Sequence, residues 1–246
     1  MNELDFSGRR ALVVGGSSGI GNGIAQAFRA HGAAVHVWGT RPAASDYSAA
    51  DGSDLDGLGY SAVDVGDPEA IASAAAPFEE GLDSLILCQG IVAYDRKEFQ
   101  REAWDRVMAV NLDSLIHCCE KFRAALGAAG GGSIVIVSSV SGYRGNIGNP
   151  AYAASKAGAV NLTMSLGQAY ARDGIRVNGL APGLVETKLT EVTTKHPKRL
   201  EQALSGIPLR RLGTPADMAG TALFLASPLA AYVCGQTILV DGGLAL

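Results

Sequence analysis

The feature that most constrains the fold of this chain is a regular alternation of short apolar runs with helical segments. We predict seven strands from runs rich in Val, Ile and Leu, at residues 10–15, 33–39, 59–65, 82–88, 131–139, 174–183 and 235–243. We predict helices between them, the clearest at residues 20–32, 67–78, 102–126 and 151–172. Strands that are apolar throughout and separated by helices are typical of a parallel sheet covered on both faces. The sequence therefore predicts an α/β, doubly wound, Rossmann-like fold with right-handed crossovers, as a single domain over residues 1–246.

Two segments interrupt this alternation. Residues 41–58 are polar and acidic and show little helical periodicity. Their Asp residues lack the spacing of a calcium-binding EF-hand loop, because Gly52 stands two residues before Asp54 where a ligand is needed, so we expect a solvated loop. Residues 184–212 follow the end of a predicted strand and are amphipathic, which is typical of a substrate lid but also of an ordinary helical excursion on the surface.

Bulk composition excludes several classes of function. Apolar residues make up 48% and charged residues 18% of the chain, as in an ordinary globular protein. The net charge of -4 would not attract nucleic acid or an anionic membrane, and no stretch has the roughly 18 apolar residues that a membrane helix needs. The N-terminus lacks an apolar signal core, and the four cysteines form neither a CxxC pair nor a Cys/His cluster with zinc spacing. We therefore expect a cytoplasmic protein with free thiols, no metal site, no nucleic-acid partner and no membrane association.

A glycine-rich turn lies between the first predicted strand and the first predicted helix. Gly15, Gly19 and Gly21 have the spacing G-x-x-x-G-x-G. A chain that turns sharply here brings its backbone close to a pyrophosphate seated on the helix N-terminus, and a side chain at Gly15 or Gly19 would obstruct that approach. Gly21 would let helix and strand pack closely. The turn predicts a dinucleotide site.

Tyr152 and Lys156 lie four residues apart in the Ala-rich segment 149–160, and so on one face of the predicted helix. Such a pair is common on helix surfaces, where it has no chemical role. It would also suit proton transfer, because a cation one turn away favours the phenolate and lowers the pKa of a tyrosine. The spacing alone leaves both interpretations open.

Together, the glycine turn and the Tyr–Lys pair resemble the classical short-chain dehydrogenase/reductase family, and the resemblance covers essentially the whole chain. Two places depart from the family motifs. Val14 stands where the glycine motif begins with Thr, and Cys88-Gln89-Gly90 replaces Asn-Ala-Gly after the fourth strand. The resemblance implies a seven-stranded parallel sheet of order 3-2-1-4-5-6-7 and a homotetramer or homodimer formed through two long helices and the C-terminal strand.

The resemblance assigns catalytic roles to Asn111, Ser139, Tyr152 and Lys156. Tyr152 would act as general acid and base, while Lys156 and the positive nicotinamide ring of the oxidised cofactor would together lower the pKa of its phenol. Lys156 would also bind the nicotinamide ribose. Ser139 would polarise the substrate carbonyl, and Asn111 would hold a water that connects Lys156 to solvent. Ser138 is the alternative candidate for the catalytic serine, but the spacing of thirteen residues to Tyr152 favours Ser139.

The resemblance also implies a nicotinamide cofactor bound by the glycine turn, the strand ends and the catalytic pair. Asp64 would meet the adenine beside Val65, although an Asp here also caps the following turn in many proteins. Thr187 and the backbone near Val185 would hold the carboxamide. The complete set of expected cofactor-binding residues is Gly15, Ser17, Ser18, Gly19, Ile20, Gly21, Arg41, Asp64, Val65, Gly90, Tyr152, Lys156, Pro182, Gly183, Val185 and Thr187.

The end of the second predicted strand favours NADP(H) over NAD(H). Members that prefer NAD carry an acid there, which binds the ribose hydroxyls of the adenosine. Gly39 takes that position here, and Arg41 follows it and could pair with a 2′-phosphate. Ser18 could donate a further hydrogen bond. Arg41 would have no such role if it were simply a solvated loop cation.

The predicted function is hydride transfer between NAD(P) and a small-molecule secondary alcohol or ketone. Substrate contacts are expected from Tyr94, Ser139, Ser141 and Leu184, but these residues do not choose among sugars, polyols, steroids and oxoacyl thioesters. The alternative is a catalytically silent cofactor-binding sensor or partner protein of the same fold. Such proteins usually lack the Tyr or the Lys of the pair, and this chain has both.

Overall fold

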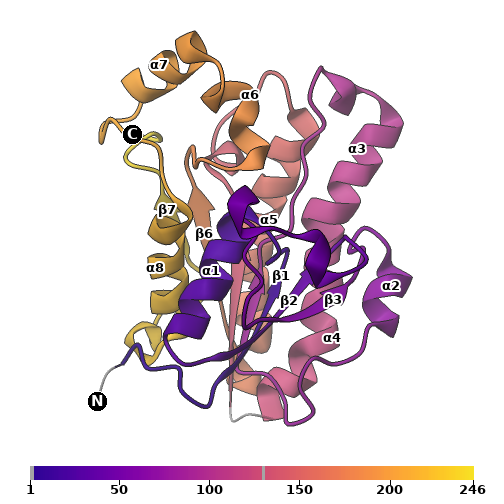
Figure 1. Cartoon of the computed structure of the whole chain (residues 1–246). Helices are drawn as coiled ribbons and strands as arrows, with labels where there is room; N and C mark the ends of the chain where they lie inside the picture. The colour runs from indigo at the N-terminus through magenta and orange to yellow at the C-terminus, as the bar shows by residue number, and fades with distance from the viewer. Residues whose placement is uncertain (1–2, 129–130) are drawn as a thin grey trace.

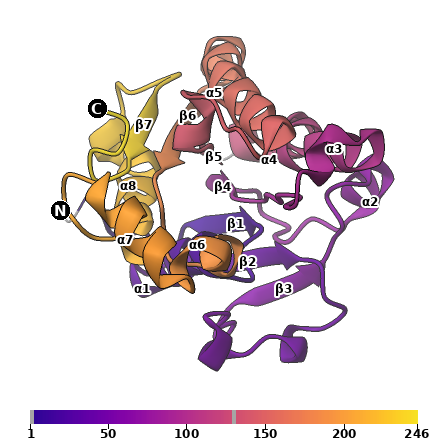
Figure 2. The ribbon, with the colours of Figure 1, turned by 90° about the horizontal axis from the view of Figure 1, so that it is seen from above.

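The computed structural model describes residues 3–128 and 131–246. Residues 1–2 and 129–130 of the predicted domain lie outside the described residues. Seven strands form one sheet of order β3-β2-β1-β4-β5-β6-β7 in which every neighbouring pair is parallel (Figures 1 and 2). The predicted fold and strand order are therefore confirmed. The strands are β1 Arg10–Val14, β2 Ala34–Gly39, β3 Gly59–Ala62, β4 Ser84–Leu87, β5 Ser133–Val137, β6 Arg176–Pro182 and β7 Thr237–Val240.

The alternation of side chains along each strand divides the apolar residues between two cores, one on each face of the sheet. In β1, Leu12 and Val14 belong to one buried cluster, whereas Ala11 and Val13 belong to the other. Every residue of β4 and β5 is buried. Burial on both faces is the reason that these strands are apolar throughout rather than alternating with polar residues.

Helices cover both faces of the sheet, as a doubly wound fold requires. One cluster contains residues of α2, α4 and α5, and the other contains residues of α1 and α8. Figure 2 shows these two groups on opposite sides of the strands. The helices are α1 Gly19–Ala30, α2 Pro68–Ser73, α3 Arg101–Met108, α4 Ser114–Ala128, α5 Pro150–Tyr170, α6 Glu191–Thr194, α7 Pro197–Ser205 and α8 Pro215–Ala226. Short 3₁₀ turns are η1 Ala44–Asp46, η2 Ala49–Asp51, η3 Lys97–Phe99, η5 Val140–Gly142, η6 Ala171–Asp173, η7 Lys188–Thr190 and η8 Pro228–Ala230.

Two predicted helices differ from those observed. The helix expected over 67–78 ends at Ser73, and Ala74 leaves the helical conformation with ψ 134°. Pro77 could not continue the helix, because its ring would clash with the carbonyl group four residues earlier. The helix expected over 102–126 is interrupted between α3 and α4 by a π-helical turn, η4, at Ala109–Asp113. A π-turn inserts one residue into the helix and so rotates the residues on either side of it. Hydrophobic periodicity in the sequence does not reveal it.

The segment expected to be a lid, 184–212, forms η7, α6 and α7 above the carboxyl ends of the strands (Figure 1). Its two ends are joined, since the Gly213 amide donates to the Leu184 carbonyl at 2.9 Å and the Glu186 amide donates to the Gly213 carbonyl at 3.2 Å. The excursion is thus closed at its base by backbone hydrogen bonds.

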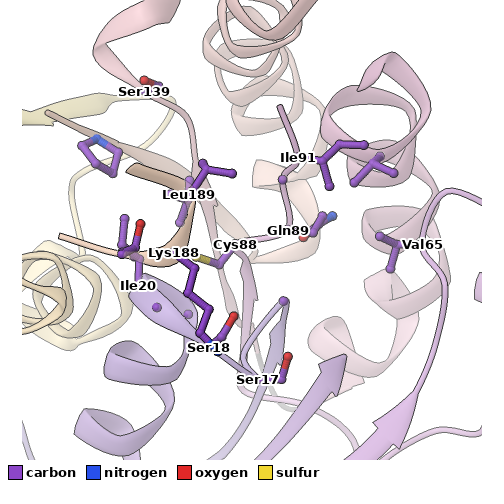
Figure 3. Close-up of a pocket in the computed structure, with 18 of the residues that line it drawn as sticks. Ser17, Ser18, Ile20, Val65, Cys88, Gln89, Ile91, Ser139, Lys188 and Leu189 are labelled. Carbon is purple, nitrogen blue, oxygen red and sulfur yellow. The ribbon is translucent and has the colours of Figure 1, made fainter. Parts of the chain in front are cut away.

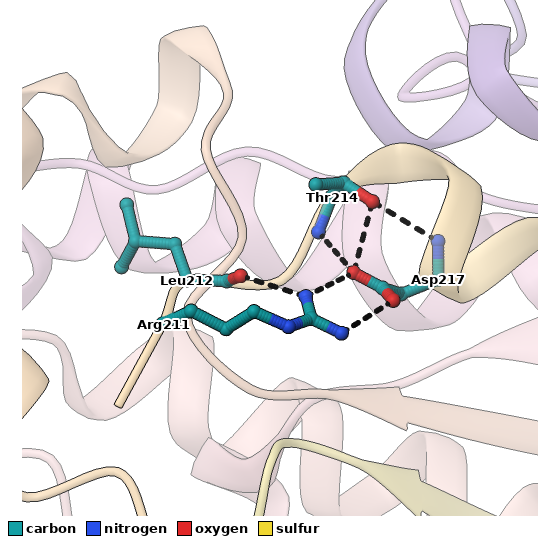
Figure 4. Close-up of polar contacts among 4 residues, drawn as sticks. All are labelled: Arg211, Leu212, Thr214 and Asp217. Carbon is teal, nitrogen blue, oxygen red and sulfur yellow. Dashed lines mark hydrogen bonds and ion pairs between the residues drawn. The ribbon is translucent and has the colours of Figure 1, made fainter. Parts of the chain in front are cut away.

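The C-terminal end of this segment is also fixed by the start of α8. The Thr214 hydroxyl accepts from the Asp217 amide at 3.2 Å, and the Asp217 carboxylate accepts from the Thr214 amide at 2.7 Å. This reciprocal pair is a capping box, which satisfies two helix-end donors. Arg211 reaches both carboxylate oxygens of Asp217, at 2.7 and 2.9 Å (Figure 4). The arginine and the cap together hold the segment where it joins α8.

No helix in the described part of the chain is both long enough and apolar enough to cross a membrane.

Candidate active site

A cleft of about 400 Å³ opens at the carboxyl ends of the central strands. It is lined by residues that follow β1, β2, β3, β4, β5 and β6, and by η7 of the lid segment (Figure 3). β1 lies between β2 and β4, so the chain leaves it in one direction along the sheet and returns on its other side. Ligands of open parallel sheets bind at such a switch point.

The glycine turn after β1 forms one wall of the cleft. Gly15 has φ +73°, and a Cβ there would lie 2.8 Å from the backbone N and Cα of Gln89. A Cβ on Gly21 would lie 2.1 Å from the Gly15 carbonyl oxygen. The turn therefore has no room for side chains at these positions, and its backbone is exposed to the cleft.

The start of α1 fits a pyrophosphate. Ser18 is the N-cap of α1, but within the described chain its side chain accepts no hydrogen bond from the first turn of the helix. Gly19, with φ +54°, faces Thr187 across the cleft, and its Cβ would lie 3.3 Å from the Thr187 methyl carbon. Amide groups without a capping side chain at a helix N-terminus bind anions, so the residues present here suit a dinucleotide phosphate.

Tyr152 and Lys156 both line the cleft from α5. The Lys156 ammonium nitrogen lies 5.8 Å from the centre of the Tyr152 ring, and it donates to the Val137 carbonyl oxygen at 2.9 Å. Lys156 is only 4% exposed, and burial lowers its pKa to about 8. The pair is therefore in the cleft rather than on a solvated helix face.

The pKa of the Tyr152 phenol is governed mainly by its burial. Burial raises the pKa of Tyr152 above its ordinary value, and the hydrogen bond with Ser139 lowers it only in part. The sequence led us to expect that the Lys156 cation, together with the positive nicotinamide ring of the oxidised cofactor, lowers this pKa. Among the protein's own residues burial is the largest influence on the phenol, so Tyr152 is a neutral phenol at neutral pH.

Ser139, and not Ser138, is hydrogen-bonded to the Tyr152 phenol. Ser139 bonds to Tyr152, and its hydroxyl oxygen accepts from the Ser141 amide at 3.1 Å. The Ser138 hydroxyl donates to the backbone carbonyl of Lys156 at 2.8 Å. Ser138 thus joins the end of β5 to α5, whereas Ser139 lies beside the Tyr152 phenol.

Asn111 is fully buried in the π-turn η4, behind the cleft rather than in its lining. Its side-chain oxygen accepts from the Ile91 amide at 2.8 Å, and its side-chain nitrogen donates to the Ile91 carbonyl and to the Ser155 hydroxyl at 2.9 and 3.2 Å. The amide joins the loop after β4 to α5. One lone pair of its oxygen remains for a water, which is compatible with the expected role.

Comparison with known proteins identifies the family. Residues 14–245 match the family model described as enoyl-(acyl carrier protein) reductase. A 3-oxoacyl-(acyl-carrier-protein) reductase from Chlamydia muridarum is 36% identical over 251 residues, covering 100% of both chains. A galactitol 2-dehydrogenase (L-tagatose-forming) from Cereibacter sphaeroides is 39% identical over 248 residues, covering 97% of this chain and 95% of its own. The chain belongs to the classical short-chain dehydrogenase/reductase family.

The solved structures agree with this assignment. A gluconate 5-dehydrogenase from Burkholderia cenocepacia J2315, in complex with NADP and tartrate, superposes with a TM-score of 0.89 at 29% identity. The match covers 99% of this chain and 97% of that one. The resemblance inferred from the glycine turn and the Tyr–Lys pair is therefore confirmed, and the protein is an oxidoreductase of the short-chain type.

In this short-chain dehydrogenase/reductase, Gln89 replaces the motif Ala after β4, and Cys88 replaces the motif Asn. The Gln89 side-chain nitrogen donates to the Ser114 hydroxyl at 2.9 Å, and that hydroxyl donates to the Val110 carbonyl at 2.7 Å. The strand end is thereby braced against α4. Cys88 is partly buried in the cleft wall, where loss of hydration raises the pKa of its thiol to about 12, so it is neutral.

Asp64 lines the cleft as expected, but it has a partner that the sequence did not indicate. Arg106 of α3 donates to both Asp64 carboxylate oxygens, at 2.8 and 3.0 Å. Asp64 also accepts from the Gly66 amide at 2.9 Å, which is the turn-capping alternative. The turn-capping role is thus present, and Arg106 orients the carboxylate beside Val65 at the edge of the cleft, where contact with an adenine remains a prediction.

Most of the predicted cofactor-binding residues line the cleft, but several predicted residues do not. Tyr94 donates from its hydroxyl to the Leu189 carbonyl, and so joins the loop after β4 to the lid segment. The Arg41 guanidinium stacks on the Tyr47 ring, 4.7 Å from its centre. The predicted residues absent from the described cleft lining are Arg41, Tyr94, Asn111, Ser141 and Leu184.

The cleft also contains residues that the sequence analysis did not assign to cofactor or substrate. Val63, Cys88 and Val137 could have been predicted, because they lie near the carboxyl ends of strands, where ligands of such sheets bind. Arg106 and Lys188 could not, because their positions depend on how α3 and the lid segment pack. The full set is Trp38, Gly39, Thr40, Val63, Cys88, Gln89, Ile91, Arg106, Val110, Val137, Ser138, Lys188, Leu189 and Thr190. Among the described residues, no group of three or more His, Cys, Asp or Glu could hold a metal ion.

Proposed function

We propose that this protein interconverts a secondary alcohol and a ketone, with Tyr152 as general acid and base and NADP(H) as the preferred cofactor. The observation that carries the proposal is the convergence of the Tyr152 phenol, Ser139 and Lys156 in one cleft with a glycine turn shaped for a dinucleotide. The nicotinamide, when bound, supplies or accepts the hydride. The chain's own residues donate and accept the proton.

In the direction of ketone reduction, Ser139 donates a hydrogen bond to the carbonyl oxygen and Tyr152 transfers its phenolic proton to that oxygen. The raised pKa of Tyr152 keeps this proton in place at neutral pH until it is needed. The Lys156 ammonium then stabilises the phenolate that remains. Lys156 uses one N–H for the Val137 carbonyl, so its other donors are available for ribose hydroxyls and for a water held by Asn111.

The preference for NADP(H) rests on the end of β2. Gly39 contributes no carboxylate that would repel a 2′-phosphate, and Arg41 lies two residues further on. The related gluconate 5-dehydrogenase structure contains NADP, which supports the same choice. Separate titrations with NADPH and NADH measure this preference, and tighter binding of NADH would contradict it.

The substrate proposal is a small secondary alcohol or its ketone, bound beneath the lid segment near Ser139, Tyr94, Ser141 and Leu184. The relatives' names include an oxoacyl thioester reductase and dehydrogenases of a polyol and of gluconate. A turnover screen of these three classes with both cofactors identifies the class. Failure to turn over any of them would favour the silent cofactor-binding alternative.

The acid–base assignment has a direct test. We expect Tyr152→Phe to lose nearly all turnover on any accepted substrate while NADPH binding, followed by the fluorescence of the reduced nicotinamide, is retained. Tyr232→Phe is the matched control, because Tyr232 is fully exposed and is not part of the described cleft lining. Turnover by Tyr152→Phe close to that of the control would reject the role of the phenol.

We also propose a homotetramer or homodimer. Apolar side chains remain on the outer surface of α5 and at the C-terminus, where Met164 is 44% and Leu246 105% exposed. Sedimentation analysis that finds a monomer at micromolar concentration would contradict this assembly.

A further inference from the structure

The carboxyl end of β2 is covered by a tyrosine from the segment 41–58. The Tyr47 hydroxyl oxygen accepts from the backbone amides of Thr40 and Arg41, at 3.2 and 3.1 Å. Two consecutive N–H groups that converge on one oxygen form a small anion-binding concavity. Here a phenol oxygen occupies it.

This oxygen lies at the boundary of the cofactor cleft. A Cβ on Gly39 would lie 2.6 Å from the Tyr47 hydroxyl oxygen and 2.7 Å from the Ser17 hydroxyl oxygen. Gly39, Thr40 and Ser17 all line the cleft. The phenol and Ser17 thus fill the space in which a side chain at position 39 would stand, and the 2′ position of an adenosine ribose is read at this place in dinucleotide-binding sheets.

The same tyrosine holds Arg41 away from the cleft. The Arg41 guanidinium stacks over the Tyr47 ring at 4.7 Å and donates to the Asp46 carbonyl oxygen. The guanidinium that could pair with a 2′-phosphate is therefore engaged by the residue that occupies the phosphate's backbone donors. One movement of Tyr47 would free both the amides and the cation.

We propose that Tyr47 is a specificity-determining gate, whose phenol occupies the 2′-phosphate subsite and must leave before a 2′-phosphate can bind. The inference rests on the proposed function in one respect, since it requires the adenosine of the cofactor to bind in this cleft. With the phenol in place, the subsite accommodates an adenosine that carries a 2′-hydroxyl. With the phenol displaced, the two amides and Arg41 become ligands of the phosphate. The gate does not reverse the preference for NADP(H); it limits the size of that preference.

The segment that carries Tyr47 is suited to such a movement. The side chains around it in η1 and η2 are exposed, and Tyr47 packs against Tyr60 with ring centres 5.6 Å apart. A further tie across the cleft joins Lys188 to the Asp51 carboxylate at 3.6 Å, and both partners are more than half exposed. Exposed ion pairs of this kind contribute little to stability, so they do not lock the segment.

The test measures binding of two fragments that carry no nicotinamide, adenosine 2′,5′-bisphosphate and adenosine 5′-monophosphate, by isothermal titration calorimetry. We expect Tyr47→Ala to bind the bisphosphate on the order of tenfold more tightly than the wild type, because two hydrogen bonds and a stacking contact no longer compete with it. Affinity for the monophosphate should change less than twofold. Tyr47→Phe, which keeps the ring and loses only the hydroxyl, should give a smaller gain of the same sign.

A double-mutant cycle tests the release of Arg41. Arg41→Ala should weaken bisphosphate binding more in the Tyr47→Ala background than in the wild type, since the guanidinium reaches the phosphate only after the phenol has gone. Tyr232→Phe is the control for a general effect of removing a phenol hydroxyl. Thermal unfolding of each variant shows whether it is folded.

Three outcomes would overturn the inference. Weaker bisphosphate binding in Tyr47→Phe would show that the phenol is a ligand of the phosphate rather than its competitor. Equal changes for both fragments would show that Tyr47 does not read the 2′ position. If the wild type bound neither fragment, the proposed cofactor site itself would be wrong. That result differs from one in which both fragments bind but the ratio of their affinities is the same in the wild type and in the Tyr47 variants, which would reject the role of Tyr47 alone.

Discussion

Glu98 offers the sharpest test of how the phenol of Tyr152, the proposed acid and base, is held in position. This carboxylate is fully buried in η3. One of its oxygens accepts from the Ala93 amide at 3.0 Å and from the Asn149 side-chain amide at 3.3 Å, and the other accepts from the Tyr152 amide at 2.9 Å. Glu98 thereby joins the loop after β4 to the first turn of α5, at the residue that carries the phenol.

The size of the effect follows from these three hydrogen bonds. Bonds to a charged group contribute about 1.5–3 kcal/mol each, and a buried donor left without an acceptor costs about 1–3 kcal/mol. Glu98→Gln keeps one oxygen and presents an NH₂ group to a donor, so we expect the free energy of unfolding to fall by roughly 2–3 kcal/mol. Glu98→Ala loses every acceptor and should cost roughly 4 kcal/mol.

A second readout separates positioning of the phenol from general stability. The negative charge of Glu98 is among the groups that raise the pKa of Tyr152, although burial is the larger cause. Neutralising it should lower that pKa. In the proposed mechanism alcohol oxidation uses the phenol as a base, so the rise of the oxidation rate with pH should move to lower pH in Glu98→Gln. A variant that merely unfolded more easily would show no such shift.

The measurements are urea unfolding at fixed pH and initial rates of alcohol oxidation between pH 6 and 10. Glu102→Gln is the matched control, because Glu102 is exposed on α3, near in sequence to Glu98. The control should unfold as the wild type does and keep its pH profile. If Glu98→Gln matched the control in both measurements, the carboxylate would not be holding Tyr152, and the reasoning from its hydrogen bonds would be refuted.

Two further predictions concern the glycine turn and the buried lysine. Gly21→Ala should abolish nucleotide binding in calorimetry, because its Cβ would overlap the Gly15 carbonyl oxygen, whereas Gly220→Ala in α8 meets open space and should raise the melting temperature slightly. Burial lowers the pKa of Lys156 from 10.5 to about 8. Between these two pH values the unfolded chain keeps a proton on Lys156 that the folded protein has lost, so the free energy of unfolding should increase as the pH rises from 8 towards 10.5. In urea titrations, the wild type should gain roughly 3 kcal/mol relative to Lys156→Met over this interval, and a constant difference would contradict the assignment of the lowered pKa.

The sequence could predict the sheet because its strands are buried on both faces. Runs such as residues 82–88 and 131–139 admit few alternatives, and helices between them dictate parallel pairing. The position of Tyr152 and Lys156 on one face of α5 was also predictable, since residues four apart in a helix are neighbours on its surface. Features that depend on the hydrophobic periodicity of one segment, or on a motif of fixed spacing, can be predicted from a single sequence.

Features that depend on contacts between distant segments were not predictable. Glu98 meets Tyr152 from 54 residues away, and no periodicity marks it. The π-turn around Asn111 changes the helix by one residue, which the pattern of apolar residues tolerates. Tyr47 lay in a segment whose composition indicated only a solvated loop. In each case the deciding interaction is a polar contact made after the sheet and helices have packed.

The electrostatics of the catalytic pair also depends on packing rather than on spacing. In water a tyrosine and a lysine have similar pKa values, 10.0 and 10.5. Burial opposes charge on both, so it raises the pKa of the phenol and lowers that of the ammonium to about 8. At neutral pH the phenol therefore keeps its proton while Lys156 remains largely cationic. A neutral phenol beside a cation can donate a proton, and the cation then stabilises the phenolate that remains. Under the proposed mechanism, the protonation states of these two side chains suit ketone reduction near neutral pH, and alcohol oxidation would be helped by a higher pH or by further positive charge beside Tyr152.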